Sequence, residues 1–506
     1  MRSITKAASV AICIVLIALS GIAQEKPPAP GAPRPAKIPR IIETRLPNGL
    51  RVVTVERHSS PLVAARLMIG VGTTAEKLQS SGLANMTSDL ITKGTKTRNA
   101  TQIAEDLEFL GADLNTTVGL DTTNLSLTVT SDKLAQALAV MADVSLRPTF
   151  PQAELDLLKS QKLDELTASL KSPGFLTTYV ASVYAFGGNP AGGTPESLKE
   201  MNRAQVSAFY NDYYDPDRST LIFVGDITPA KALSLARANF GTWRSKGLPA
   251  GEPEGEISVA NEGATGVRPL VTGILVVDLP NAGQASVAYV KALAGVGRIK
   301  AEGGSPEGPE KDHHNEISDD YIPGVVANSV LGGGYSARLN QEIRIKRGLS
   351  YGAGSSISWR RLSSRFSTRV QTKNESAAEV AELVADEVRR LGKDKAATTE
   401  LAARKAALIG EFGLRLETDA DLLGLISDLY AYGLDAEELE GYGNDVQRVD
   451  AAKAAQFASE HLPGGSIVIA GDYAKFKVDL AKRFHDTPIT VIAADKIDLS
   501  KPNLQK

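Results

Sequence analysis

Residues 82–95 read GLANMTSDLITKGT, a segment in which small and apolar residues surround three polar ones. Asn85, Ser88 and Asp89 follow the spacing i, i+3 and i+4, which places their side chains on one face of a helix. Metal ligands and a general base can share a helical face with this spacing. The segment therefore predicts a helix beginning near Gly82, and the types of its polar residues decide whether that face can do chemistry.

Strand and helix patterns flank this segment. Before it, the pair Asn48-Gly49 is a tight-turn signal between two β-rich runs. After it, residues 97–118 contain a helical pattern with a stop at Gly111. The pattern then predicts a strand at residues 124–131 and a helix at residues 132–146. The first half of the chain therefore reads as a mixture of strands and helices.

The two halves of the chain contain similar segments. FYNDYYDPDRSTLIFVGD at residues 209–226 resembles FASEHLPGGSIVIAGD at residues 457–472, and the closing Gly-Asp pairs lie 246 residues apart. Each segment combines a helix end, a polar turn, a β-rich run and Gly-Asp. A period this long suggests duplicated α+β domains, because solenoid repeats have periods of about 20–50 residues.

Length and composition limit the possible classes of protein. A chain of 506 residues exceeds one compact core, so at least two domains are expected. The hydrophobic content of 42% and charged content of 23% are ordinary for a globular protein. The formal net charge of −3 and the lack of a Lys/Arg-rich run argue against a nucleic-acid partner.

The N-terminal residues have the pattern of a secretory signal peptide. Arg2 and Lys6 precede an apolar run, and small residues then lead to a predicted cleavage after residue 23. The single cysteine, Cys13, lies inside this segment, so the mature chain would have no disulfide. A Pro-rich lead-in follows at residues 24–38. We expect export across the inner membrane to the periplasm with no stable membrane span, an uncleaved anchor helix being the alternative.

Changes in composition predict the domain boundaries. Residues 246–270 are rich in Gly, Pro and Glu and are typical of a linker, and residues 298–318 are typical of a surface loop. The predicted division is a signal peptide at 1–23, a lead-in at 24–38, an N-terminal domain at 39–245, a linker at 246–270, a C-terminal domain at 271–486 and a tail at 487–506.

Six fragments in order resemble the pitrilysin/insulinase family of zinc peptidases, which includes the mitochondrial processing peptidases and the core proteins of the respiratory bc1 complex. They are LPNGLRVV, the GLA…KGT frame of residues 82–95, LEFLGADLN, ADVSLRPTFPQAELD, NPAGGTPESLKEM and LGGGYSARLNQEIRIKRGLSYG. The resemblance implies an α+β fold with two homologous mixed-sheet domains. Each domain would have helices packed on one face of its sheet, and the two would face each other in a clamshell arrangement.

The resemblance also implies what the residues of the opening segment replace. Active members of the family carry His-x-x-Glu-His on this helix and a further Glu ligand downstream. Asn85 and Asp89 occupy the His positions, Ser88 occupies the Glu position, and Glu165 matches the downstream ligand. An amide is a poor zinc ligand, and a serine hydroxyl is no general base at neutral pH without an activating partner.

We therefore expect no catalytic residue and no zinc in this chain, and we expect zinc only in a partner subunit. One alternative is that Asp89 and Glu165 keep a relic site for Ca²⁺ or Mg²⁺, which prefer oxygen ligands. No other zinc site is evident, because the five histidines include no His-x-x-x-His pair. Only His313 and His314 cluster, and they lie in the predicted surface loop.

Two other site residues are retained. In active members the C-terminal domain supplies an Arg and a Tyr, seven residues apart, that bind the substrate backbone. Arg344 and Tyr351 match them in EIRIKRGLSY. A guanidinium and a phenol can both donate hydrogen bonds to a peptide carbonyl as negative charge develops. The alternative is structural, with Arg344 in a surface ion pair and Tyr351 packed at the start of a strand.

The sequence thus favours a peptidase-like protein that is inactive alone. It would be the non-catalytic subunit of a heterodimeric zinc peptidase, supplying substrate-binding Arg344 and Tyr351 to a zinc-bearing paralogue that degrades or processes peptides. The main alternative is a scaffold or peptide-binding protein with no role in proteolysis. A third class, an independent zinc peptidase, needs ligands that the sequence does not show.

Overall fold

Two six-stranded mixed β-sheets organise the chain, one in each half. The computed structural model describes residues 37–247, 273–298 and 316–506, except 362, 437 and 502–503. The first sheet has the strand order β1-β2-β6-β3-β5-β4, in which only the β2–β6 pair is parallel. Its strands are β1 (Ile41–Arg45), β2 (Arg51–Glu56), β3 (Leu62–Ile69), β4 (Asp113–Val118), β5 (Thr123–Thr130) and β6 (Ser219–Gly225).

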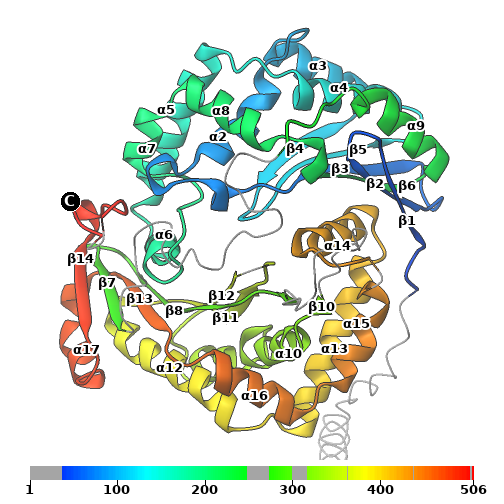
Figure 1. Cartoon of the computed structure of the whole chain (residues 1–506). Helices are drawn as coiled ribbons and strands as arrows, with labels where there is room; N and C mark the ends of the chain where they lie inside the picture. Colours follow the sequence, from blue (N-terminus) through cyan, green and yellow to red (C-terminus); the bar gives the residue numbers. More distant parts are fainter. Residues whose placement is uncertain (1–36, 248–272, 299–315, 362, 437, 502–503) are drawn as a thin grey trace, which may run out of the picture. The chain divides into compact units, whose positions relative to one another are not determined.

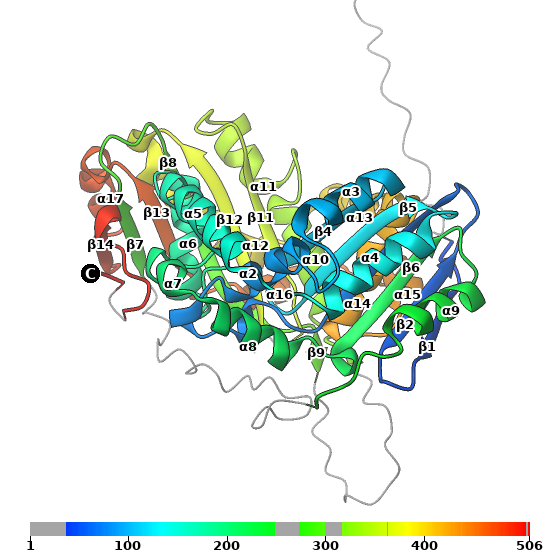
Figure 2. The same cartoon turned by 90° about the horizontal axis from the view of Figure 1, so that it is seen from above.

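The second sheet repeats this arrangement. Its order is β14-β7-β13-β8-β12-β11, which Figure 2 shows from edge to edge. The six strands are β7 (Ile274–Asp278), β8 (Ala285–Ala294), β11 (Ala353–Ser358), β12 (Ser363–Thr372), β13 (Ser466–Gly471) and β14 (Ile489–Ala493). A separate antiparallel pair joins β9 (Gly297–Arg298) and β10 (Glu316–Ile317).

The repeated segments found in the sequence occupy equivalent places in the two sheets. β6 lies between parallel β2 and antiparallel β3, and β13 lies between parallel β7 and antiparallel β8. Both strands are buried along their whole length. The edge strands differ, because β1 pairs antiparallel with β2 whereas β14 pairs parallel with β7. The expected duplication of a mixed-sheet domain is confirmed.

Helices connect the strands in the same order in both halves (Figure 1). The first half contains α2 (Leu83–Leu90), α3 (Ala100–Leu110), α4 (Leu134–Leu146), α5 (Gln152–Ser169), α6 (Pro173–Tyr184), α7 (Pro195–Glu200), α8 (Arg203–Tyr213) and α9 (Pro229–Phe240). The second half contains α10 (Tyr321–Gly332), α11 (Arg338–Asn340), the π-helical η5 (Gln341–Ile345), α12 (Ala377–Lys393), α13 (Thr398–Arg415), α14 (Asp419–Tyr432), α15 (Glu438–Arg448), α16 (Ala451–His461) and α17 (Lys477–Arg483).

Alternate residues of the central strands face different cores, as the period of two in a strand requires. In β6, Leu221 and Phe223 pack with the helices of the first half, whereas Ile222 and Val224 pack with α14. Correspondingly, α6 packs on β8 and β13. Each sheet therefore has its own helices on one face and one helix from the other half on the opposite face. This double burial explains why β6 and β13 are continuous apolar runs.

Local signals in the sequence are also confirmed. Gly49 has a φ of +89° in the turn before β2, a conformation that glycine adopts without steric cost. Gly82 directly precedes α2. Gly111 ends α3 in the left-handed conformation, and Asn99 caps the start of that helix.

The predicted tail at residues 487–506 is wrong in part. Residues 489–493 form β14, whose parallel pairing with β7 makes it an edge strand of the second sheet. This five-residue segment, ITVIA, lies beyond the last segment of family resemblance and is too short for a periodicity that indicates pairing. The predicted signal peptide and most of the predicted linker and surface loop, with His313 and His314, lie outside the described residues. Within the described ranges, no helix has the length and apolar character needed to cross a membrane.

Candidate functional site: a substituted metal helix and an arginine–tyrosine pocket

A buried carboxylate fixes the start of α2. Glu76 accepts hydrogen bonds from the backbone N–H groups of Gly82 at 3.0 Å and Ala84 at 2.6 Å. Asn189 donates to the backbone carbonyl of Glu76 at 2.6 Å. These bonds satisfy donors that a helix N-terminus otherwise leaves unpaired. The helix that carries the three polar residues is therefore held in place by residues outside it.

Of the first two polar side chains, Asn85 makes a structural hydrogen bond and Ser88 is buried. The amide nitrogen of Asn85 donates to the carbonyl of Ala191 at 2.6 Å. Ser88 is fully buried, and its hydroxyl lies beside the phenol of Tyr214. Burial raises the pKa of Tyr214, so this phenol stays protonated and cannot activate Ser88 as a base. Neither an amide oxygen nor a serine hydroxyl is a typical zinc ligand.

The third polar residue, Asp89, is paired with a cationic side chain of the protein. Asp89 forms an ion pair with the Nζ atom of Lys162 at 2.6 Å. Lys162 lies on α5, three residues before Glu165, which is exposed. An ammonium group thus supplies the positive charge that a metal ion would bring to Asp89. In the described ranges, no group of three His, Cys, Asp or Glu residues could hold a metal ion.

In the second half, Arg344 and Tyr351 line the same pocket, which has a volume of about 580 Å³. The lining consists of glycines and of polar, aromatic and cationic side chains, and none of the described residues that line it is a carboxylate. The larger side chains are Gln284, Tyr335, Asn340, Arg344, Tyr351, Arg369 and Gln371. The structure therefore brings together the two residues selected from the sequence, in a pocket whose charged groups are both guanidinium groups.

The Arg344 side chain is free of ion pairs with described residues. It belongs to the π-helical segment η5, a geometry that is frequent at functional sites. Its guanidinium carbon lies 5.0 Å from the centre of the Tyr335 ring. The nearby carboxylate of Glu342 is bound by Lys346 and Arg347 instead, and the hydrogen bond from Lys346 lowers its pKa. No described residue accepts a hydrogen bond from the Arg344 guanidinium, whose donors can therefore serve a ligand.

Tyr351 has a fixed backbone and a free side chain. Its ring is 90% exposed. On one side, Thr372 donates to the carbonyl of Leu349 at 2.6 Å, and on the other, Asn340 accepts from the N–H of Ala353 at 3.2 Å. A tyrosine with so little buried surface adds little to stability. The structural alternative, an ion pair at Arg344 and packing at Tyr351, does not match this geometry.

Family comparisons agree with the fold. The model for the insulinase family of peptidases (M16) matches residues 51–184, and the model described as the peptidase M16 inactive domain matches residues 200–408. The chain belongs to the insulinase (M16) family. The first match lies within the first half, whereas the second match begins before β6 of the first sheet and ends in α13 of the second half.

Related proteins of the insulinase family cover most of the chain. A Mycobacterium leprae protein named as an uncharacterized zinc protease is 26% identical over 420 residues, covering 82% of this chain and 87% of that protein. A similarly named Bacillus subtilis protein is 25% identical over 378 residues, covering 73% and 83%.

Solved structures share the fold. The peptidase M16 inactive domain from Pseudomonas fluorescens has a TM-score of 0.72 at 24% identity, covering 85% of this chain and 98% of that one. A protease from Helicobacter pylori has a TM-score of 0.75 at 19% identity, covering 86% and 100%.

The zinc that the insulinase family implies does not fit this member. Zinc sites use imidazole, thiolate and carboxylate donors in a tetrahedral set. Here one His position holds Asn85, whose amide donates a hydrogen bond to a backbone carbonyl. The other holds Asp89, which is ion-paired with Lys162, and the Glu position holds the buried Ser88. At these three positions, this insulinase-family chain therefore offers neither the two histidine donors for zinc nor the general base.

Sequence reasoning missed most residues of the arginine–tyrosine pocket, among them three with large side chains. Tyr335 contacts Arg344, and Arg369 and Gln371 line the pocket from β12. Arg369 and Gln371 are two residues apart and so share one face of their strand. That alternation is visible in SSRFSTRVQT, but the sequence does not say which face meets Arg344.

The capping carboxylate of α2 predicts an unusual pH dependence. Burial raises the pKa of Glu76 to about 8, although two backbone N–H groups oppose this shift. The folded state then holds a proton that the unfolded chain releases above about pH 4.5, so stability falls as pH rises from there to about 8. Because Glu76→Gln removes this titration, the variant should gain about 2 kcal/mol relative to the wild type between about pH 5.5 and 7.5.

Urea unfolding at several pH values measures this difference. Glu375→Gln, which changes an exposed carboxylate in the second half, is the control and should follow the wild type. Parallel stability profiles for Glu76→Gln and the wild type would show that Glu76 does not bind this proton.

Proposed function

We propose that this insulinase-family protein is a non-catalytic subunit that supplies Arg344 and Tyr351 to the peptide-cleaving site of a zinc-bearing paralogue. The proposal rests chiefly on one observation, the arginine–tyrosine pocket. Its Arg344 forms no ion pair with a described residue, and its Tyr351 is 90% exposed. The same chain has Asn85 and Asp89 at the two positions where active members carry zinc-binding histidines. This combination suits a site in which one subunit supplies the arginine and tyrosine and the other subunit supplies the zinc ligands.

The chemistry of the pocket fits a peptide backbone. Arg344 offers a permanently charged fork of N–H donors, and Tyr351 offers one O–H donor. Arg369 adds a second positive charge, and no carboxylate among the described lining residues competes for these donors. Such donors hold a peptide carbonyl and stabilise the negative charge that develops on its oxygen during cleavage.

The proposed partner supplies what this chain lacks. Zinc and the general base would belong to a paralogous subunit with an intact His-x-x-Glu-His, and this chain would bring no cofactor of its own. The predicted N-terminal signal peptide places the assembly in the periplasm as part of the same proposal. The partner, the location and the peptide substrates all stay predictions.

Reconstitution tests the proposal. The chain and a zinc-bearing homologue from the same source, both lacking their signal segments, are purified separately and then mixed. Cleavage of a fluorogenic peptide library is measured for each protein and for the mixture, alongside the mass of the complex. We expect rapid cleavage only in the mixture.

The alternative functions give different results. A complex that forms without any gain in cleavage, or peptide binding by the chain without a partner, would support a scaffold or a peptide-binding protein and contradict the proposed role.

A further inference from the structure

Strand β12 presents a row of polar and cationic side chains on one face. Its sequence SSRFSTRVQT alternates strictly, so that every second residue is buried and the residues between them stay partly or fully exposed. We call four residues of the exposed set the arginine strip, namely Arg365, Ser367, Arg369 and Gln371. Arg369 and Gln371 also line the arginine–tyrosine pocket. Arg365 lies four residues from Arg369, which is about 13 Å along a strand.

The strand that carries the arginine strip and the elements beside it contain no acidic residue. On one side, α6 packs on β8, the neighbour of β12. The Nε2 atom of Gln371 lies 2.9 Å from the position that a Cβ atom on Gly174 of α6 would take, and the Arg365 guanidinium carbon lies 4.9 Å from the centre of the Phe186 ring, just beyond the end of α6. On the other side, β11 pairs with β12 and forms the edge of the sheet. The sequences are PGFLTTYVASVY for α6, ASVAYVKALA for β8 and AGSSIS for β11.

Arg365 is a partly buried cation without an ion pair of its own. The carboxylate of Asp121 acts on it, but this carboxylate accepts two hydrogen bonds from Arg360, one of them at 2.8 Å. Burial and the charge of Arg360 lower the pKa of Arg365 to about 10, and Asp121 only partly offsets this effect. Arg365 therefore stays charged at neutral pH. Because burying an unpaired charge costs free energy, a further carboxylate that reached Arg365 would be bound favourably.

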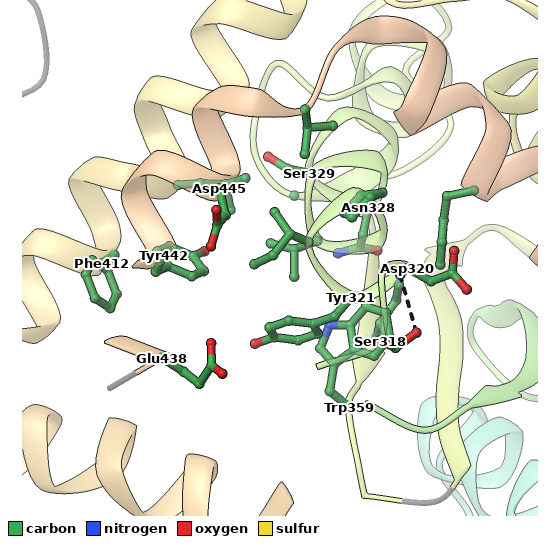
Figure 3. A pocket seen from close by; sticks show the side chains of 18 of the residues that line it. Ser318, Asp320, Tyr321, Asn328, Ser329, Trp359, Phe412, Glu438, Tyr442 and Asp445 are labelled. Carbon is green, nitrogen blue, oxygen red and sulfur yellow. Dashed lines mark hydrogen bonds between the residues drawn. The ribbon is translucent and has the colours of Figure 1, made fainter. Parts of the chain in front are cut away.

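Arginines elsewhere in the second half are paired. A cavity of about 970 Å³ lies among α10, α13, α14, α15 and α16, and Figure 3 shows Tyr442 and Asp445 on its wall. Each of the two arginines that line this cavity has an aspartate partner, at 3.3 and 2.8 Å. The pairs are Arg415–Asp428 and Arg448–Asp445. In contrast, Arg365 and Arg369 of the arginine strip form no ion pair with any residue that the structure describes.

We propose that the arginine strip binds an acidic segment of the peptide that the arginine–tyrosine pocket holds, with one carboxylate at Arg369 and another at Arg365. This inference rests on the proposed function, because it names the substrate class of the same site. In an extended peptide, side chains i and i+4 lie about 13 Å apart, which matches the spacing of the two arginines along β12. Ser367 and Gln371 add hydrogen-bond donors between and beside them. A basic segment would be repelled, and a neutral one would leave Arg365 unpaired.

Matched peptides test this preference in the reconstituted mixture. A fluorogenic peptide without other charged residues is made with Glu at two positions four residues apart and, separately, with Gln at the same two positions. The pair of positions is moved along the sequence in successive peptides. At low ionic strength, the ratio of kcat/KM for the Glu peptide to that for the Gln peptide should reach about ten or more in at least one register, because each carboxylate gains an ion pair with an otherwise unpaired arginine.

The same peptides give a measurement that does not need cleavage. Dissociation constants measured by fluorescence anisotropy on the mixture, with its zinc chelated, should show the same preference for Glu over Gln. A mixture that cleaves none of the peptides contradicts the proposed function, and the anisotropy ratio then still decides whether acidic segments are preferred. The two failures are therefore distinguishable.

Charge variants test the assignment to the arginine strip. The double variant Arg365→Gln/Arg369→Gln should bring the Glu-to-Gln ratio to about one, because both pairing charges are lost. Since the ratio compares two peptides on one variant, a general change in activity does not affect it. Arg369→Gln alone, which changes an exposed side chain, should lower the ratio about threefold. The control Arg389→Gln/Arg448→Gln removes two charges that each pair with an aspartate, and its ratio should match that of the parent.

Two results would overturn the proposal. One is a ratio near or below one for the parent in every register. The other is a ratio that the double variant leaves unchanged or that the control lowers equally. Near-UV circular dichroism confirms that each variant is folded, and Arg369→Gln alone decides the matter if the double variant does not fold.

Discussion

In the reconstituted mixture, Arg344→Ala should lower kcat/KM for peptide cleavage about 100-fold or more, the usual cost of removing one donor to a developing oxyanion. The pocket geometry supports this size of effect. Arg344 has no ion pair with a described residue and is held over Tyr335, so its charge is directed into the pocket. Tyr351→Phe, which removes only the hydroxyl, should cost about tenfold, as expected for an uncharged donor. Steady-state kinetics of the mixture measures both.

A matched control separates this role from a general loss of charge. Arg347→Ala removes the same side chain three residues later, where its partner is Glu342. That variant should keep most of the activity and should form the complex normally. If Arg344→Ala and Tyr351→Phe cleaved peptides at the wild-type rate, the assigned role of the pocket would be wrong.

The largest effect on stability is expected at Asp143. This fully buried carboxylate accepts hydrogen bonds from Thr95, Thr97, Arg98 and Arg147 at 2.6 to 2.8 Å. Asp143→Asn leaves Arg147 without its charge partner and leaves Arg98 paired with Asp106 alone, so the free energy of unfolding should fall by about 3 kcal/mol. Urea unfolding measures this change. Asp106→Asn removes the exposed partner of Arg98 and should cost less than about 1 kcal/mol.

The lowered pKa of Asp143 predicts part of the loss of stability in acid. Burial alone would raise the pKa of Asp143, but the hydrogen bonds hold it at about 2. A carboxylate whose pKa is lowered by folding stabilises the protein above its unfolded pKa and loses that contribution as pH falls. The loss should amount to about 2 kcal/mol between about pH 4 and 2, and Asp143→Asn should lack it. An unchanged acid transition in this variant would contradict the assignment.

The sequence predicted the repeated fold because its signals are local. Continuous apolar runs, tight-turn pairs and the Gly111 stop depend on neighbours in the chain, and each is found where expected. Edge strand β14 was missed because its five residues, ITVIA, do not indicate a pairing partner. The exchange of α6 and α14 between the two sheets was also not predicted, since it depends on contacts between distant parts of the chain.

The sites were predictable to different degrees. Arg344 and Tyr351 could be selected because EIRIKRGLSY resembles the family segment that carries an Arg and a Tyr seven residues apart. Arg369 and Gln284 enter the same pocket from β12 and from the turn before β8, which only the folded sheet brings together. Lys162 was missed for a similar reason. Its contact with Asp89 joins α5 to α2 across more than seventy residues.

One assay tests the central claim most directly, namely the cleavage of peptides by the purified chain alone, with and without a chelator and with its zinc content measured on the same sample. Because Asn85, Ser88 and Asp89 supply neither the zinc ligands nor the general base, the chain should contain no stoichiometric zinc and should cleave no faster than the buffer. Chelator-sensitive cleavage by the isolated chain, with about one zinc ion bound per molecule, would contradict this account.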